Sequence, residues 1–277
     1  FTKVSKFRRT MFCIDSVAAE YCAANVSPSE IVIGKEQAGQ ISDRLLNWYY
    51  VNRRKMPWRG DDTEIPRSAY GTWISEVMLQ QTRVETVISY WNRWMKEFPD
   101  VPSLANATPE DVNRLWAGLG YYRRAQMLLQ GAKKVVADFG GIMPETVPEL
   151  LSVPGIGPYT AGAIASIAYG KQEPLVDGNV IRVLSRLRAL TLEVGGGAME
   201  RMCWKIAKEL VPSKQPGDYN QALMELGATV CKPTSPSCGS CPLSDHCHAL
   251  ALSKLAESVD AADNNKVTRS KPEGNKT

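Results

Sequence analysis

Hydrophobic residues recur at three- and four-residue steps along most of the chain, the spacing that places them on one face of a helix. The pattern is clearest in residues 41–51, 84–98 and 181–190. No stretch alternates apolar and polar residues at every second position, as a half-buried strand does. There is also no repeat of solenoid length. The chain is therefore predicted to be all-α.

Several helix starts are marked by local chemistry. Thr108 is a cap residue followed by proline and two acids, which suit the first turn of a helix. Thr146 and Glu149 have the spacing of a capping box. The two ends lack such signals, because residues 1–35 show no sustained period and residues 254–277 are polar. We interpret both ends as an extension and a linker outside the core.

Composition narrows the class of protein only moderately. The chain has 277 residues, of which 44% are hydrophobic and 22% are charged, so it can form one large domain or two modest ones. No apolar run approaches the ~20 residues of a membrane-spanning helix, and no membrane partner is predicted. A net charge of +4 permits nucleic-acid binding without requiring it. Cys13, Cys22 and Cys203 lack metal-ligand spacing, which indicates reduced thiols.

Four cysteines near the C-terminus have the spacing Cys231-x6-Cys238-x2-Cys241-x5-Cys247. Three prolines keep this stretch out of a helix, which lets the thiols converge. A closed set of four thiolates suits either tetrahedral zinc or an iron–sulfur cube. Only Cys238 and Cys241 form the short knuckle that structural zinc sites use in pairs. We therefore expect a cluster, with zinc and buried or disulfide-bonded cysteines as the alternatives.

Two carboxylic residues are candidates for acid–base work. Thr72, Glu76 and Gln80 fall on one face of a predicted helix between large apolar residues. An acid in such a pocket has a raised pKa, as a general acid requires, although a solvated helix stripe is the commoner case. Asp177 precedes a periodic helix, where a carboxylate caps the helix and stays ionised. A protonated and an ionised carboxyl are the pair used in glycoside cleavage, but the sequence does not show that the two meet.

Two turns have features that suit DNA. In residues 150–161, Gly155 and Gly157 join two helical stretches and allow a phosphate to approach the backbone. This is the form of a helix–hairpin–helix, which grips DNA backbone without reading sequence, and a plain tight turn is the alternative. Residues 118–124 combine aromatic, apolar and cationic side chains that can wedge into a duplex. The alternative there is a turn with its tyrosines packed inside.

These segments, in this order, resemble the adenine DNA glycosylase family of the endonuclease III superfamily. The matching stretches are 56–59, 73–82, 115–122, 153–161, 176–180 and the cysteine loop. The resemblance implies a six-helix barrel beside a module that holds a [4Fe-4S] cluster. It assigns the barrel with its helix–hairpin–helix to residues 66–179, and the cluster module to 36–65 and 180–253.

The resemblance also implies roles for individual residues. The substrate is expected to be duplex DNA with adenine opposite 8-oxoguanine or guanine, and the adenine is flipped from the stack. Glu76 protonates the adenine and helps to activate water, Asp177 stabilises the oxocarbenium ion, and Asn179 and Tyr159 position the acid and the sugar. The implied DNA contacts are Gln80, Gln81, Leu119, Tyr121, Arg123, Gly155 and Gly157. The implied cluster ligands are Cys231, Cys238, Cys241 and Cys247.

Tyr159 separates this chain from relatives that also cut the strand, which carry lysine there and form a Schiff base. We therefore expect base removal without efficient strand cleavage. The alternatives are a glycosylase for another damaged or mispaired base, and a DNA-binding cluster module inactivated by truncation.

Full-length relatives carry a further Nudix-like domain, so the chain is expected to be a catalytic portion. We further expect a monomer located in the nucleus, or also in the mitochondrion, whose tail docks repair or replication proteins.

Overall fold

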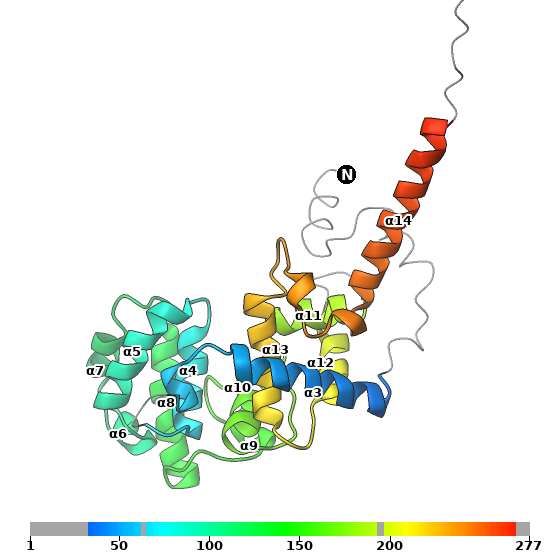
Figure 1. Cartoon of the computed structure of the whole chain (residues 1–277). Coiled ribbons are helices and arrows are strands. Elements are labelled where there is room, and N and C mark those ends of the chain that lie inside the picture. The colour runs from blue at the N-terminus through cyan, green and yellow to red at the C-terminus, as the bar shows by residue number, and fades with distance from the viewer. Residues whose placement is uncertain (1–32, 62–64, 193–196, 270–277) are drawn as a thin grey trace, which may run out of the picture.

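The computed structural model describes residues 33–61, 65–192 and 197–269. Within these ranges the regular structure is entirely helical, so the all-α prediction is confirmed (Figure 1). The expected extension 1–35 lies almost wholly outside the described residues, as do Cys13 and Cys22. The α-helices are α3 (Lys35–Asn52), α4 (Ala69–Leu79), α5 (Val84–Glu97), α6 (Val101–Ala105), α7 (Pro109–Trp116), α8 (Arg123–Phe139), α9 (Val147–Leu151), α10 (Pro158–Ala163), α11 (Gly178–Leu187), α12 (Ala198–Leu210), α13 (Pro216–Thr229) and α14 (His248–Arg269).

One hydrophobic core is formed by the helices from α4 to α10, and we call it the first core. It is rich in tryptophan: Trp73, Trp91, Trp94 and Trp116 are all fully buried. The rings of Trp94 and Trp116 meet edge to face with centroids 5.6 Å apart, a favourable geometry for aromatic pairs. The Trp91 indole N–H donates to the carbonyl of Gly71 at 3.1 Å. These contacts fix α5 against α4 and α7.

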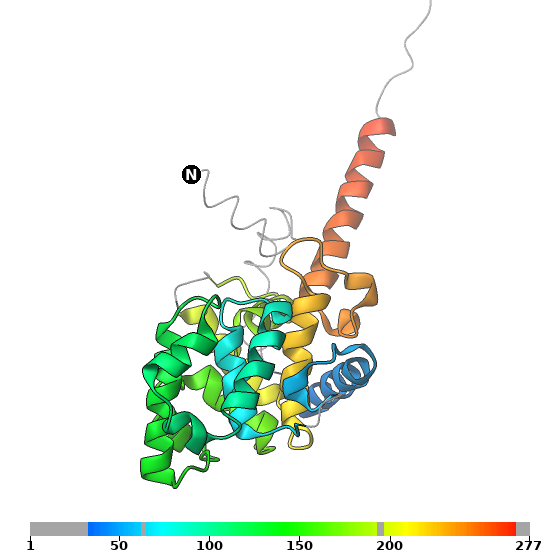
Figure 2. The ribbon, with the colours of Figure 1, turned by 90° about the vertical axis from the view of Figure 1, so that its left-hand side faces the viewer.

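The second core joins the beginning of the described chain to its last third. Helix α3 packs along α12 and α13, and α11 completes the set (Figure 1). Leu45, Leu184, Ile206 and Leu226 are among its buried residues. Seen from the side, the helices of the two cores lie next to each other, with α14 projecting away (Figure 2). Met56 and Trp58 pack in the first core, and the exact domain limits stay a prediction.

The helix caps follow the local sequence. The Thr108 hydroxyl accepts from the backbone N–H of Asp111 at 3.2 Å, and the Asp111 carboxylate accepts from the N–H of Thr108 at 3.3 Å. This is a complete capping box. The Thr146 hydroxyl likewise accepts a hydrogen bond from the backbone N–H of Glu149 at 3.4 Å. The Glu149 carboxylate accepts a hydrogen bond from the Thr146 hydroxyl at 2.6 Å, and not from a backbone N–H as a complete capping box would have it.

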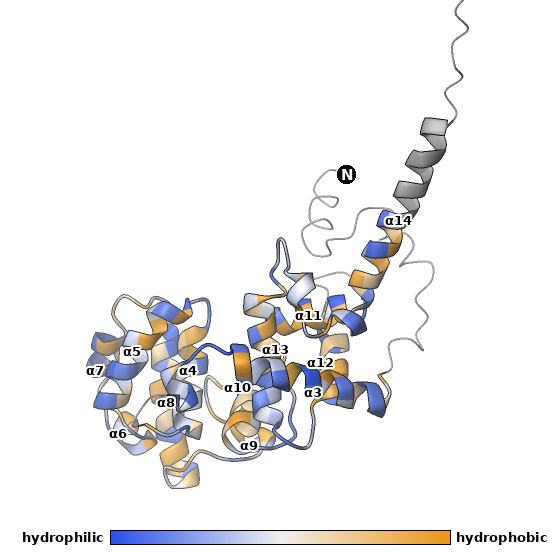
Figure 3. Cartoon of the chain, viewed as in Figure 1, coloured by the Kyte–Doolittle hydropathy of each residue, from blue (hydrophilic) through white to orange (hydrophobic). Residues whose placement is uncertain are grey.

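Helix α14 differs from the expectation for the C-terminal segment. We expected a polar linker from residue 254, whereas the helix continues to Arg269. The segment 248–258 contains three alanines, three leucines, one lysine and one glutamate, all residues of high helix propensity. Figure 3 shows polar and apolar residues mixed along the helices. No helix in the described ranges is long and apolar enough to cross a membrane.

Candidate active site

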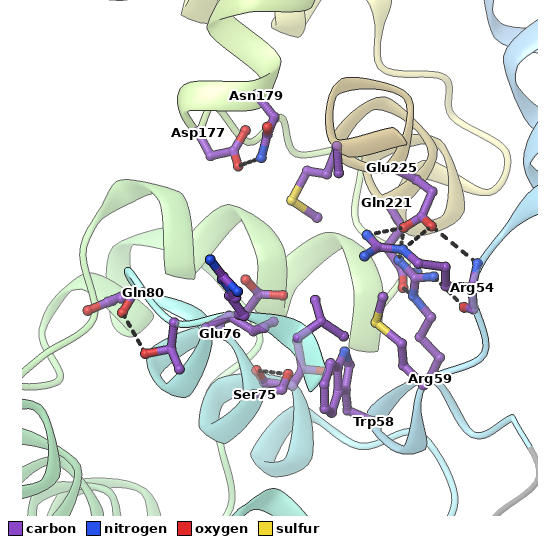
Figure 4. A pocket seen from close by; sticks show the side chains of 18 of the residues that line it. Arg54, Trp58, Arg59, Ser75, Glu76, Gln80, Asp177, Asn179, Gln221 and Glu225 are labelled. Carbon is purple, nitrogen blue, oxygen red and sulfur yellow. Dashed lines mark hydrogen bonds and ion pairs between the residues drawn. The ribbon is translucent and has the colours of Figure 1, made fainter. Parts of the chain in front are cut away.

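A cavity of about 610 Å³ is lined by residues from both cores (Figure 4). Helix α4 contributes Glu76 from the first core. The turn before α11 contributes Asp177, and α13 contributes Gln221, Met224 and Glu225 from the second core side. The cavity thus collects side chains that lie far apart in the sequence.

Glu76 lies on the face of α4 that the sequence predicted. Thr72, Glu76 and Gln80 all line the cavity, one helical turn apart. The Glu76 side chain is buried, with a residue exposure of 6%, so this face is not a solvated stripe. The Tyr159 hydroxyl donates a hydrogen bond to the Glu76 carboxylate. Burial raises the pKa of Glu76 to about 7, a rise opposed by that hydrogen bond and increased by the negative charge of Asp177.

Asp177 is the N-cap of α11. One carboxylate oxygen accepts from the backbone N–H of Val180 at 2.7 Å, and the other accepts from the Asn179 amide at 2.9 Å. Both oxygens of the Asp177 carboxylate therefore accept a hydrogen bond, which fixes the orientation of the group. The cavity pairs this capped carboxylate with the buried acid of Glu76. Two carboxyl groups in such different surroundings can act as proton donor and as anion in one reaction.

A polar network at another wall of the cavity was not predicted from the sequence. The Arg59 guanidinium donates to Gln221 at 3.0 Å and to Glu225 at 3.1 Å. Arg54 also donates to Glu225, at 2.7 Å. Burial opposes ionisation of Glu225, but the hydrogen bonds from Arg54 and the charge of Arg59 hold its pKa below the usual value. Arg59 lies in the matched stretch 56–59, whereas nothing in the pattern of α13 marked Gln221 or Glu225.

Five of the seven residues expected to contact DNA line a second cavity of about 520 Å³, and Leu119 and Gly157 are not among its lining residues. Its lining includes Gln80, Gln81, Tyr121, Arg123 and Gly155. Gln81 and Tyr121 both adopt left-handed backbone conformations, with φ of 57° and 50°. The Tyr121 side chain is exposed at 62%, as a residue that meets DNA must be.

Leu119 differs from the expectation of an exposed wedge. It is 6% exposed and packs in the first core. The turn that carries it presents Tyr121 to solvent and folds the leucine inward, because burying an aliphatic side chain is favourable. In this conformation the exposed side chains of the 118–124 segment include Tyr121, Tyr122 and Arg123.

The glycine turn joins α9 and α10, as the helix–hairpin–helix pattern requires. Gly155 has φ of +84°, and a Cβ at this position would lie 2.9 Å from the Cβ of Met127. Only glycine therefore fits without strain. Gly157 is the N-cap of α10 and Pro158 occupies its first turn, where the missing N–H of proline costs nothing.

The four cysteines of the C-terminal loop line one small cavity of about 80 Å³. Within the described ranges, no three His, Cys, Asp or Glu side chains are grouped tightly enough to hold a single metal ion. Four thiols that line one cavity provide the donor set of an iron–sulfur cluster, in which each iron takes one thiolate. The Arg186 guanidinium lies 3.4 Å from the Cys231 sulfur. The residues present therefore fit an iron–sulfur cluster.

The cysteine loop is joined to the first cavity by hydrogen bonds. Arg182 donates to the carbonyl of Cys231 at 2.8 Å and to the side-chain oxygen of Asn179 at 2.7 Å. Asn179 in turn donates to Asp177. The position of Asp177 is thereby connected to the fold of the cysteine loop.

Two family models match the sequence. Residues 74–209 match the HhH-GPD superfamily of base excision DNA repair proteins, and residues 231–247 match the iron–sulfur binding domain of endonuclease III. Curated relatives include the adenine DNA glycosylase of Arabidopsis thaliana, 46% identical over 88% of this chain and 42% of the relative. The adenine DNA glycosylase of Homo sapiens is 51% identical over 74% of this chain and 38% of the relative. The chain thus spans less than half the length of these relatives.

Solved structures share the fold. A thermostable thymine-DNA glycosylase superposes with a TM-score of 0.67 and 27% identity, covering 78% of this chain and 97% of that chain. A non-covalent endonuclease III–DNA complex superposes with a TM-score of 0.64 and 21% identity, covering 79% and 98%. The second likeness concerns the fold alone.

Proposed function

The chain belongs to the adenine DNA glycosylase family of the HhH-GPD superfamily, and on this premise we propose that it excises adenine mispaired with 8-oxoguanine or guanine. Its cysteine loop is an iron–sulfur binding domain of the endonuclease III type. Cys231, Cys238, Cys241 and Cys247 would hold the cluster, whose binding would stabilise the fold of the loop. The observation that carries the proposal is the buried acid Glu76, whose cavity also contains the capped carboxylate of Asp177.

The two carboxyl groups support cleavage of the bond between adenine and its sugar. With a pKa of about 7, Glu76 holds its proton in about half of the molecules at neutral pH. That proton passes to the adenine ring, so that the base leaves neutral when the glycosidic bond breaks. The sugar is left as an oxocarbenium ion, which the Asp177 carboxylate stabilises. Water then adds to the sugar carbon, and its proton returns to Glu76.

The polar network of Arg59, Gln221 and Glu225 supports adenine as the base that enters the cavity. The major-groove edge of adenine presents an acceptor at N7 and, beside it, the donor amino group. A wall with the Arg59 guanidinium, the Gln221 amide and the Glu225 carboxylate offers both a donor and acceptors to such an edge. A mispaired adenine leaves the stack at lower cost than a paired one.

The cavity lining also supports base removal without strand cleavage. Its described lining residues include no lysine, and Tyr159 stands beside Glu76 instead. An imine with the sugar requires an amine. The phenol of Tyr159 therefore serves as a hydrogen-bond donor to the acid.

A single-turnover assay tests the proposal. Duplexes with adenine opposite 8-oxoguanine, guanine or thymine are incubated with excess protein and analysed with and without hot alkali. We expect breaks only after alkali and only at mispaired adenine, and Glu76→Gln should abolish them while leaving duplex binding intact. Breaks without alkali, or release of another base from a lesion panel, would overturn the proposal. Nuclear placement, a monomeric state and the docking of proteins on residues 254–277 stay predictions.

A further inference from the structure

Arg124, the second residue of α8, joins two segments that face the second cavity. One terminal nitrogen of its guanidinium donates to three carbonyls at the C-terminal end of α4, and the other donates to the following turn and to the 117–122 turn. The acceptors are the carbonyls of Val77 at 2.9 Å, Met78 at 3.1 Å, Gln80 at 2.6 Å, Leu119 at 3.5 Å and Gly120 at 3.2 Å, and the hydroxyl of Thr82 at 3.4 Å.

The environment of Arg124 is unlike that of an ordinary ion pair. No carboxylate contacts it among the described residues, and burial lowers its pKa. Three of its partners are the carbonyls of Val77, Met78 and Gln80, which lie where α4 ends and its last carbonyls lack helical donors. A cation is favourable at that end of a helix. The rings of Trp116 and Tyr121 each lie 5.3 Å from the guanidinium carbon, within cation–π range.

The contacts of Arg124 surround two strained residues. Gln81 and Tyr121 hold positive φ without being glycine, and such conformations persist only where the surroundings enforce them. Arg124 binds the residues on both sides of Gln81, namely Gln80 and Thr82. It also binds the carbonyl directly before Tyr121 and stacks on the Tyr121 ring. The Arg124 side chain thus contacts the surroundings of both strained residues, Gln81 and Tyr121, which we call the two corners.

We propose that Arg124 is a positioning residue that holds Gln81 and Tyr121 at a fixed spacing, so that the two corners probe the duplex together before adenine leaves the stack. The inference rests on the proposed function and extends it from the chemistry to the selection of the mispair. Arg124 contacts no reacting atom in this arrangement. Its effect is on the step that brings adenine into the cavity, while Glu76 and Asp177 act afterwards.

The test compares Arg124→Lys on two substrates. Lysine keeps the charge but has a compact ammonium group in place of the planar fork, and it does not span both corners. One substrate is adenine opposite 8-oxoguanine in a duplex. The other is adenine opposite an abasic site, which has no pairing partner and needs less probing. The matched control is Arg114→Lys, because Arg114 lies on the surface of α7 and meets Glu97 at 3.4 Å.

We expect Arg124→Lys to slow excision from the mispaired duplex by about tenfold to a hundredfold, the size of effect that misplacement by an ångström produces. On the unpaired adenine the loss should be less than about threefold, since the chemical step is intact. A 2-aminopurine at the target position should report slower unstacking in the variant. Arg114→Lys should match the parent protein in each measurement.

An equal loss on both substrates would mean that Arg124 supports the fold only, and no loss on either would mean that the corners do not need it; each result overturns the inference. If Arg124→Lys does not fold by circular dichroism, Thr82→Val removes one of its anchors and should show the same split in weaker form. Failure of the proposed function is separate, because the parent protein would then release no adenine from either substrate.

Discussion

Removing the hydroxyl of Tyr159 is expected to move the alkaline limit of adenine excision to higher pH. The hydroxyl donates to the Glu76 carboxylate, which favours the ionised form of the acid. Tyr159→Phe removes this donor and leaves the burial of Glu76 almost unchanged. The proton on Glu76 is then held more tightly, and it persists to higher pH.

The magnitude follows from the environment of the acid. Burial raises the pKa of Glu76 from 4.5 to about 7, which corresponds to a free energy of about 3 kcal/mol. At pH 7 about half of the Glu76 side chains carry the proton, compared with about one in 300 for an ordinary glutamate. A hydrogen bond to a charged group contributes about 1.5–3 kcal/mol. Its loss should therefore shift the alkaline limit upward by about a pH unit or more.

The assay is single-turnover excision with saturating protein from about pH 5.5 to 9. The quantity compared between variants is the pH at which the rate falls to half its maximum, and not the maximal rate itself. The parent rate should fall as pH rises through about 7. A parent rate independent of pH in this range, or a limit in Tyr159→Phe that stays in place or moves downward, would refute the reasoning.

The raised pKa of Glu76 also leads us to expect that the stability of the protein depends on pH. Because the folded pKa of Glu76 is above the unfolded value, its contribution is fully present below pH 4.5 and is lost as pH rises through about 7. The free energy of unfolding should decline over that window by up to about 3 kcal/mol. Urea titrations at several pH values should show this decline in the parent protein, and Glu76→Gln should lack it.

Three other substitutions address separate parts of the molecule. Asp177→Asn should keep the helix cap, changing the free energy of unfolding by less than about 1 kcal/mol, yet slow excision at least about a hundredfold; near-full activity would contradict the assigned role. Gly155→Ala should destabilise the protein by about 1–3 kcal/mol in chemical denaturation, because φ is +84° and the new Cβ meets Met127. Thr72→Val should stabilise the ligand-free protein by about 1 kcal/mol, since the Thr72 hydroxyl is buried without a hydrogen-bond partner; a lower melting temperature would count against this.

The sequence predicted those features that depend on neighbouring residues. The cap of Thr108, the face of α4 that carries Glu76 and the cap formed by Asp177 all follow from spacing within one or two helical turns. The contact of Arg59 with Glu225 joins residues 166 positions apart, and no local pattern marks such a pair. The burial of Leu119 was missed for the same reason, because its environment is supplied by the packing of other helices.

Helix α14 was missed for a different reason. Its residues after 253 have few large apolar groups, and we interpreted the segment as a polar linker outside the core without predicting a helix there. Intrinsic propensity is enough to continue a helix that the preceding residues have already nucleated. The helix was therefore not predicted because the segment was considered apart from the residues before it.

The placement of Glu76 and Asp177 in a cavity between two cores has a consequence for the order of events during refolding. Arg59 and Glu225, which line the same cavity, are 166 positions apart, and contacts of such long range form slowly because a large loop must first close. Helices within each core can form before the two cores meet. Recovery of excision after dilution from denaturant should therefore trail the recovery of the helical circular dichroism signal.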